Sequence, residues 1–311
     1  MNDPLQQLAG FLARAEQLLE RLEPLLPPAS RLPDWQAADA FRWRKGSGSA
    51  YLQAVTRRPQ IRLADLQDID EQKRRIDANT RQFLAGHPAN NVLLTGARGS
   101  GKSSLVKALL NEYAASGLRL IEVDKVDLVD LPDIVDLLDG RRERFIIFCD
   151  DLSFEPGDAR YKALKVVLDG SLSATPENVL IYATSNRRHL MPEYFAENLE
   201  NTRLGEEIHP GETSEEKISL SERFGLWLSF YPFDQAAYLN IVAHWLQTLG
   251  CSPAEICAAE RDALNWAIER GSRSGRVAWQ FARDLAGREK IRAGDQAQLG
   301  QAPAGVLTGM P

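Results

Sequence analysis

The chain of 311 residues is long enough for one large domain or two smaller ones, and its 44% hydrophobic and 26% charged residues are usual for a globular protein. A net charge of −6 argues against a general electrostatic attraction to nucleic acid, and no apolar run approaches the ~20 residues that a membrane-spanning helix needs. Three cysteines without metal-type spacing, and an N-terminus without a secretory pattern, lead us to expect a cytoplasmic protein without a membrane span.

Residues 1–62 are expected to form an N-terminal extension. Apolar residues at helical spacing over 1–23 predict an amphipathic helix, which packs on the body of the protein or docks onto a partner or a neighbouring subunit. The pattern over 29–59 is irregular, with aromatic and basic residues interleaved. These residues are Trp35, Phe41, Arg42, Trp43, Arg44 and Lys45. Such interleaving also occurs where single-stranded nucleic acid is stacked and neutralised, so nucleic-acid binding is one alternative.

The motif GARGSGKS at residues 96–103 lies between an apolar stretch, 91–95, and a segment with helical periodicity, 104–113. A strand, a glycine loop and a helix in this order are the context of a phosphate-binding loop. Gly96, Gly99 and Gly101 permit positive φ, so that successive N–H groups point at an anion. Lys102 then reaches the β- and γ-phosphates, and the Ser103 hydroxyl ligates Mg²⁺.

Further strands follow along the chain. They are predicted at 118–123, 144–149 and 179–184, with a fifth inside 221–233. Asp150 and Asp151 directly follow the strand at 144–149, and Asn186 follows the strand at 179–184. Ligands of open α/β sheets bind at the carboxyl ends of strands. We therefore expect Asp150 to hold Mg²⁺, Asp151 to polarise a water, and Asn186 to position that water or sense the γ-phosphate.

The last third of the chain is predicted to be helical. Residues 187–218 form a long polar excursion that is either a functional loop or merely mobile. Ser252, Pro253 and Glu255 form a capping box, followed by a helix that buries Ile256, Leu264 and Ile268. A final helix starts near residue 276, and the composition from 291 to 311 is typical of a disordered tail.

These motifs together resemble the AAA+ ATPases, a superfamily of phosphate-loop enzymes. The motifs in question are GARGSGKS, FIIFCDD, ATSN, SERFG and a later SGR. The phrases DKVDLVDLPD, FCDDLSFEPGD, IYATSNRRHL and RFGLWLSFYPFD resemble more specifically a bacterial AAA+ family known as a domain of unknown function. The resemblance covers about residues 65–285 and implies a five-stranded parallel sheet in the order 5-1-4-3-2, followed by a helical lid.

The resemblance also implies roles for individual residues. Asp150 matches the Walker B carboxylate, Asn186 sensor 1, and Arg223 the arginine that enters a neighbouring subunit's site. Arg276 matches sensor 2 on the lid, with Arg273 as a second choice. The nucleotide phosphates are expected on the Walker A loop, and the base near Leu66 to Ile69. The loop residues concerned are Gly96, Ala97, Arg98, Gly99, Ser100, Gly101, Lys102, Ser103 and Ser104.

One position departs from the family pattern. Asp151 stands where a catalytic glutamate is usual, so the carboxylate is withdrawn by about one methylene. Displacements on the order of 1 Å cost ~10²-fold in rate, which predicts slow turnover or a base supplied by Glu155.

The sequence thus predicts a homo-oligomeric AAA+ ATPase that uses ATP and Mg²⁺ and acts on a protein client. Its predicted parts are an extension over 1–62, a nucleotide-binding domain over 63–233, a lid over 234–290 and a tail over 291–311. Two alternatives remain: a nucleotide-dependent binding switch with little turnover, favoured by Asp151, and a loader or remodeller acting on DNA, motivated by Arg42 to Lys45.

Overall fold

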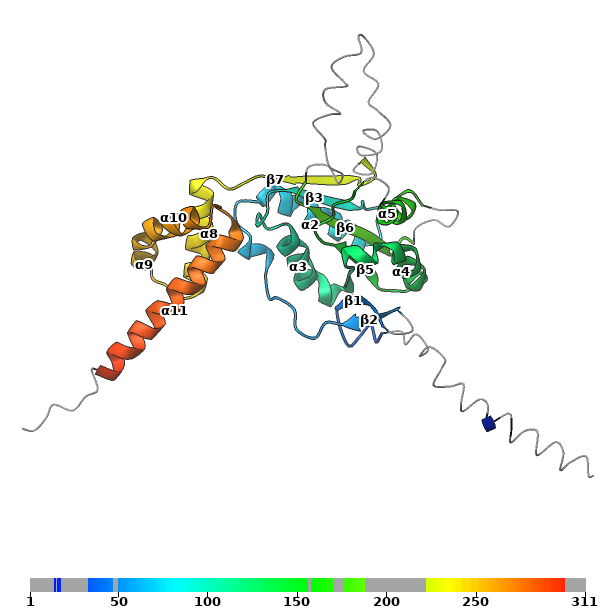
Figure 1. The fold of residues 1–311 in the computed structure, drawn as a ribbon, viewed down its shortest axis with the longest axis horizontal. Helices are drawn as coiled ribbons and strands as arrows, with labels where there is room; N and C mark the ends of the chain where they lie inside the picture. Colours follow the sequence, from blue (N-terminus) through cyan, green and yellow to red (C-terminus); the bar gives the residue numbers. More distant parts are fainter. Residues whose placement is uncertain are drawn as a thin grey trace, which may run out of the picture.

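The computed structural model describes residues 14, 16–17, 33–46, 50–155, 158–170, 176–187 and 222–299, with the side chains of 292–299 not included. The apolar stripe expected over 1–23 lies outside the described residues. So do nearly all of the 187–218 excursion and the end of the expected tail. Figure 1 shows an α/β body with a helical lid beside it.

Within the described residues, a sheet of seven strands runs in the order β2-β1-β4-β5-β6-β3-β7. Its central strands, which pair in parallel with one another, are β3 (Val92–Gly96), β4 (Leu118–Glu122), β5 (Arg144–Cys149), β6 (Val179–Ser185) and β7 (Leu226–Phe230). Read from β7 to β4, these strands have the expected order 5-1-4-3-2. The predicted fold class, an α/β fold with a mainly parallel sheet followed by a helical lid, is confirmed.

The prediction of a five-stranded sheet was wrong in strand number, because part of the segment expected to be irregular extends the sheet. β1 (Ala40–Lys45) pairs in parallel with β4, and β2 (Ala50–Ala54) pairs antiparallel with β1. Phe41 and Trp43, two residues apart, are both buried in the core. This alternation is a strand period, and the neighbouring basic residues obscured it in the sequence.

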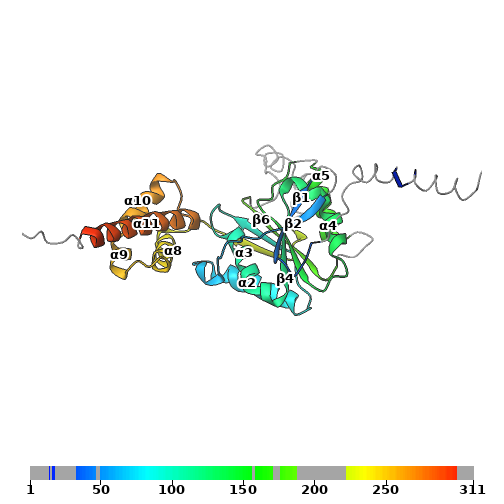
Figure 2. The ribbon, with the colours of Figure 1, turned by 90° about the horizontal axis from the view of Figure 1, so that it is seen from below.

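Each face of the sheet carries its own hydrophobic core. In β5, Phe145 and Ile147 face one core, whereas Ile146 and Phe148 face the other. The first core is covered by α4 (Leu131–Leu138) and α5 (Ala159–Asp169), and the second by α2 (Asp70–Leu84) and α3 (Lys102–Tyr113). Figure 2 shows these pairs of helices on opposite sides of the sheet. The body also contains three short 3₁₀ helices in its described part, η2 (Leu63–Asp65), η3 (Ala114–Ser116) and η4 (Lys125–Asp130).

The lid consists of α8 (Gln235–Thr248), α9 (Pro253–Ala258), α10 (Glu260–Glu269) and α11 (Gly275–Leu299), around a third core. The predicted capping box at Ser252 and Glu255 is present. The single helix expected after it is instead divided between α9 and α10, and Ile268 is 72% exposed. Ala263 and Ala267 face the lid core in its place, since small side chains let α10 approach its neighbours closely.

The final helix is longer than expected. It begins at Gly275 and continues to Leu299, past the boundary predicted near residue 290. Val277 and Phe281 are buried against the lid core, whereas Trp279 and Leu285 are half-buried. Across the described ranges, no helix combines the length and the hydropathy needed to cross a membrane.

Candidate functional site

The glycine loop joins β3 to α3 as the sequence predicts. Gly96, Gly99 and Gly101 all have positive φ, at 126°, 72° and 99°. A Cβ at Gly96 would lie 1.8 Å from the carbonyl oxygen of Phe230 in β7, and one at Gly99 would lie 2.8 Å from the Ser274 side chain. These two glycines are therefore required both for the backbone conformation and for close packing against β7 and the lid.

Lys102 begins α3 and its side chain returns over the loop. It is only 5% exposed, and its Nζ donates to the carbonyl oxygens of Gly96 and Ala97, both at 2.7 Å, and to Oδ1 of Asn186 at 3.1 Å. Burial lowers the pKa of Lys102, while the nearby carboxylates of Asp150 and Asp151 oppose that shift. All three hydrogen-bond acceptors are neutral, so the ammonium group keeps its charge available to an anionic ligand.

Asp150, at the end of β5, meets the first turn of α3. Ser103 Oγ donates to Asp150 Oδ1 at 2.6 Å, and Thr184 Oγ1 donates to the same oxygen at 2.5 Å. A hydroxyl and a single carboxylate are the kind of oxygen donors that Mg²⁺ takes from a protein when phosphates and waters supply its other ligands. The donor set thus fits Mg²⁺, and the assignment of Ser103 and Asp150 as its ligands stays a prediction.

Asp151 lies beside Asn186 in the same part of the molecule. Asn186 Nδ2 donates to Asp151 Oδ1 at 2.5 Å, so Asn186 links the carboxylate of Asp151 to the ammonium of Lys102. The backbone of Asp151 has φ of 54°, a left-handed conformation that is uncommon outside glycine. The structure therefore brings together the loop lysine, both carboxylates and the amide that the sequence singled out separately.

Thr184 is a residue of this site that sequence reasoning missed. Besides donating to Asp150, its hydroxyl accepts from the backbone N–H of Asp151 at 2.9 Å. The signal was present in the ATSN motif, where only the amide was singled out. A threonine at the end of a buried strand reads as an ordinary strand residue unless the neighbouring strand is known.

A cleft of about 1100 Å³ opens between the body and the lid. Its lining includes the loop residues from Arg98 to Ser104, both carboxylates and Asn186. Leu66 and Ile69, near which the base is predicted to lie, line it from the body, and Trp245 and Trp279 line it from the lid. The N–H of Gly275 donates to the carbonyl oxygen of Gly99 at 2.8 Å, which ties the start of α11 to the glycine loop.

Residues 36–289 match the family described as "Protein of unknown function (DUF815)". The chain belongs to this family. No protein among those with curated descriptions matches the sequence.

Several solved structures resemble this DUF815 chain. A variant of Thermotoga maritima RuvB aligns with a TM-score of 0.49 and 16% identity, over 73% of this chain and 64% of that one. The T. maritima RuvB Holliday junction branch migration motor aligns with a TM-score of 0.42 and 14% identity, over 73% of this chain and 71% of that one. A chain of an E. coli MS115-1 HORMA:CdnC:Trip13 complex aligns at 0.44, with 13% identity over 72% and 91%. This chain thus spans less than two thirds of the length of the RuvB variant named first.

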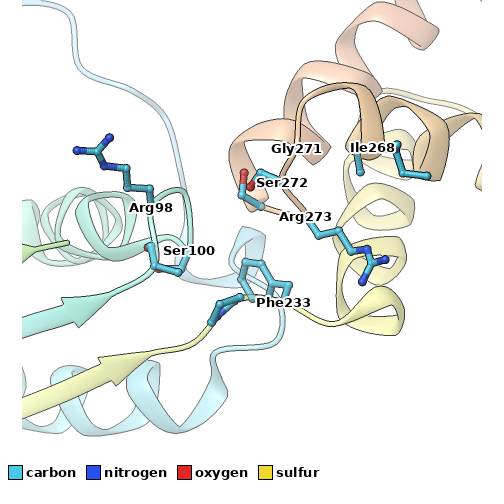
Figure 3. Close-up of a pocket in the computed structure, with 11 residues that line it drawn as sticks. Arg98, Ser100, Phe233, Ile268, Gly271, Ser272 and Arg273 are labelled. Atoms are coloured by element: carbon cyan, nitrogen blue, oxygen red, sulfur yellow. The ribbon is translucent and has the colours of Figure 1, made fainter. Parts of the chain in front are cut away.

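A second, smaller pocket of about 490 Å³ in this DUF815 member lies between the glycine loop and the turn joining α10 to α11. Figure 3 shows Arg98 and Arg273 at its two sides, extending in opposite directions. Arg276, by contrast, lines the large cleft together with the glycine loop. Of the two sensor 2 candidates, the geometry therefore favours Arg276.

Arg223 forms an ion pair within the chain. Its Nε donates to Oδ1 of Asp169, the last residue of α5. Neither Arg223 nor Glu155, the other base considered for hydrolysis, is among the residues that line the large cleft. An arginine outside its own cleft agrees with a role in a neighbouring subunit, which stays a prediction.

The basic and aromatic residues of β1 in this DUF815 chain are used inside the fold. Arg42 pairs with Glu122 at 2.5 Å, Arg44 with Asp124 at 2.8 Å, and Lys45 with Asp130 at 2.9 Å. The aromatic residues Trp35, Phe41 and Trp43 are all buried. The hypothesis of nucleic-acid binding rested on the interleaving of these residues in the sequence. Stacking and neutralisation need exposed rings and unpaired cations, and the described residues named here supply neither.

Proposed function

We propose that this protein is an AAA+ ATPase that binds ATP with Mg²⁺ and hydrolyses it to ADP and phosphate, with a change in the lid or the oligomer as the output. The observation that carries the proposal is the 2.6 Å contact of Ser103 with Asp150, beside a buried lysine on a glycine loop. A triphosphate in the cleft would replace the neutral acceptors of Lys102 with charged ones, which strengthens its hydrogen bonds.

The roles of the residues follow from the chemistry of phosphoryl transfer, which depends on positioning and charge stabilisation. Lys102 would neutralise the β- and γ-phosphates, and the loop N–H groups would orient them. Bound Mg²⁺, held by Ser103 and Asp150, would supply neutralisation of developing charge. Asp151 would accept a proton from the attacking water, and Asn186 would position that water relative to Asp151.

The first test replaces Lys102 with alanine. We expect Lys102→Ala to weaken ATP binding by roughly 10²-fold, since charged hydrogen bonds contribute about 1.5–3 kcal/mol each. Titration calorimetry with ATP and Mg²⁺ measures the affinity, and steady-state phosphate release measures turnover. Lys107→Ala is the matched control, because Lys107 lies on the same helix but does not line the cleft. Undiminished binding and hydrolysis in Lys102→Ala would refute the proposal.

A second candidate function is a nucleotide-dependent switch that holds ATP with little turnover and docks a protein client. The aspartate at position 151 favours it, because its carboxylate is one methylene shorter than a glutamate's and is engaged by Asn186. Phosphate release at saturating ATP, in wild type and in Asp151→Glu, separates the two. Steady release by wild type identifies an ATPase, whereas release restored only by Asp151→Glu identifies a switch.

A further inference from the structure

The turn that carries Asp151 is bonded to the end of the neighbouring strand, β6. The Asp151 N–H donates to Thr184 Oγ1 at 2.9 Å, and the Leu152 N–H donates to the Thr184 carbonyl oxygen at 2.7 Å. From the other side, Ser185 Oγ donates to the Leu152 carbonyl oxygen at 2.8 Å. Thr184 and Ser185 are buried, at 2% and 0% exposure. Side-chain and backbone bonds from β6 thus surround residues 151 and 152.

These hydrogen bonds stabilise a backbone conformation that is otherwise unfavourable. A non-glycine residue at a φ of 54° persists only when its surroundings over-determine it, and such residues cluster at functional sites. Aspartate tolerates this region better than residues with longer side chains. The left-handed turn therefore explains why an aspartate stands at position 151. The backbone conformation, together with the side-chain rotamer, also sets the direction of its carboxylate.

Thr184 connects this turn to Asp150, whose carboxylate is proposed to hold Mg²⁺. Its single hydroxyl donates to Asp150 Oδ1 and accepts from the Asp151 N–H, so one oxygen contacts both acidic residues. Both carboxylates line the cleft with the glycine loop. Partners that hydrogen-bond a metal-ligating carboxylate orient it, and their loss typically costs ~10–100-fold in metal affinity or activity.

We propose that Thr184 is a positioning residue for ATP hydrolysis: its hydroxyl fixes Asp150 toward Mg²⁺ and, with Ser185, holds the left-handed turn that directs Asp151 into the cleft. The proposal rests on the ATPase function proposed above. It adds a specific division of labour, because the Thr184 hydroxyl contacts the Asp150 carboxylate and the Asp151 N–H. The Ser185 hydroxyl instead donates to the Leu152 carbonyl oxygen and accepts from the Arg187 N–H. Removal of the Thr184 hydroxyl and removal of the Ser185 hydroxyl are therefore expected to change the kinetics of ATP hydrolysis in different ways.

The experiment compares Thr184→Val, which keeps the shape but removes the hydroxyl, with Thr184→Ser, which keeps the hydroxyl. Thr184→Val is expected to lower kcat by about 10–100-fold and to raise the Mg²⁺ concentration for half-maximal activity, with KM for ATP within about threefold. Thr184→Ser is expected to restore both to within about threefold of wild type. Ser185→Ala is expected to lower kcat with the Mg²⁺ dependence unchanged, since Ser185 does not contact Asp150.

Thr80→Val serves as the control for a buried hydroxyl. Thr80 bonds to Ile76 and Tyr182, away from the cleft, so its loss is expected to lower the thermal midpoint and leave kcat unchanged. Magnesium-dependent ATP binding to Thr184→Val, measured by calorimetry, gives a second readout that does not need turnover. If wild type hydrolyses ATP while Thr184→Val retains its kcat and Mg²⁺ dependence, the positioning role is wrong. If wild type neither binds nor hydrolyses ATP, the ATPase function itself fails.

Should Thr184→Val fail to fold, Ser185→Ala decides the matter. A folded Ser185→Ala protein with wild-type kcat would overturn the role of the bonds from β6, whereas a lowered kcat with normal ATP affinity would support it.

Discussion

The sheet edge formed by β1 and β2 and the carboxyl ends of β3, β5 and β6 both collect basic and acidic residues, and they use them in opposite ways. Beside β1, each basic side chain meets a carboxylate, as in the pair Arg42 and Glu122. At the carboxyl ends of β3, β5 and β6, the ammonium of Lys102 instead contacts neutral oxygens and faces a cleft. The first arrangement leaves little charge for a partner, and the second keeps a positive charge where an anion fits.

This comparison shows why residue type alone is a poor guide to function. Basic residues beside aromatic ones look like a nucleic-acid site in the sequence of β1, yet the rings of Phe41 and Trp43 are in the core. The glycine loop is different because its function depends on local backbone geometry, which neighbouring residues specify. Whether a charge is available is decided by what the fold places opposite it.

The largest expected effect concerns Arg223, which is paired with Asp169 but is predicted to act in another subunit. We expect Arg223→Ala to lower turnover by about 10³-fold or more with ATP affinity nearly intact, since an arginine supplied in trans is worth ~10³–10⁵ in rate. Phosphate release measured across protein concentrations tests this, because wild-type turnover per subunit should rise with concentration. Turnover that depends on neither the substitution nor the concentration would remove the argument for an active oligomer.

The next effect concerns Asp151, an acid that lines the cleft. We expect Asp151→Asn to lower turnover by about 10²–10⁴-fold, the usual contribution of a general base, while ATP binding persists. Asparagine tolerates the left-handed backbone, so the fold should be retained. Single-turnover hydrolysis and ATP binding give the two quantities, and a wild-type rate in Asp151→Asn would exclude Asp151 as the base. The same variant, loaded with ATP, is suited to capturing a client.

The smallest effect is expected at the β1 edge. The Arg42 and Glu122 side chains are 37% and 26% exposed, so a double-mutant cycle with alanine should give a coupling of about 0.2–1 kcal/mol in the free energy of unfolding. ATP turnover should not change. Binding to single-stranded DNA at low salt, lost in Arg42→Ala, would contradict the structural interpretation of this edge.

Much of the site was predictable because it is encoded locally. The glycine loop needs residues that accept positive φ, and Gly96, Gly99 and Gly101 occupy those positions. The strand β5 is an apolar run after Arg144 that is followed directly by two carboxylates, so its bounds could be read from the sequence. The order of the parallel strands was available only through the family resemblance, since strand pairing joins segments distant in the chain.

What only the tertiary structure decided are the contacts between distant segments. The strand β1 joins the sheet through its pairing with β4, in which Ala40 lies opposite Leu120. The exposure of Ile268 depends on how α10 packs within the lid. The role proposed for Thr184 depends on β6 lying beside β5, which brings one hydroxyl to Asp150 and Asp151 across more than thirty residues of chain. Local backbone preferences act between neighbours in sequence, whereas burial and charge pairing depend on which side chains the folded chain brings together.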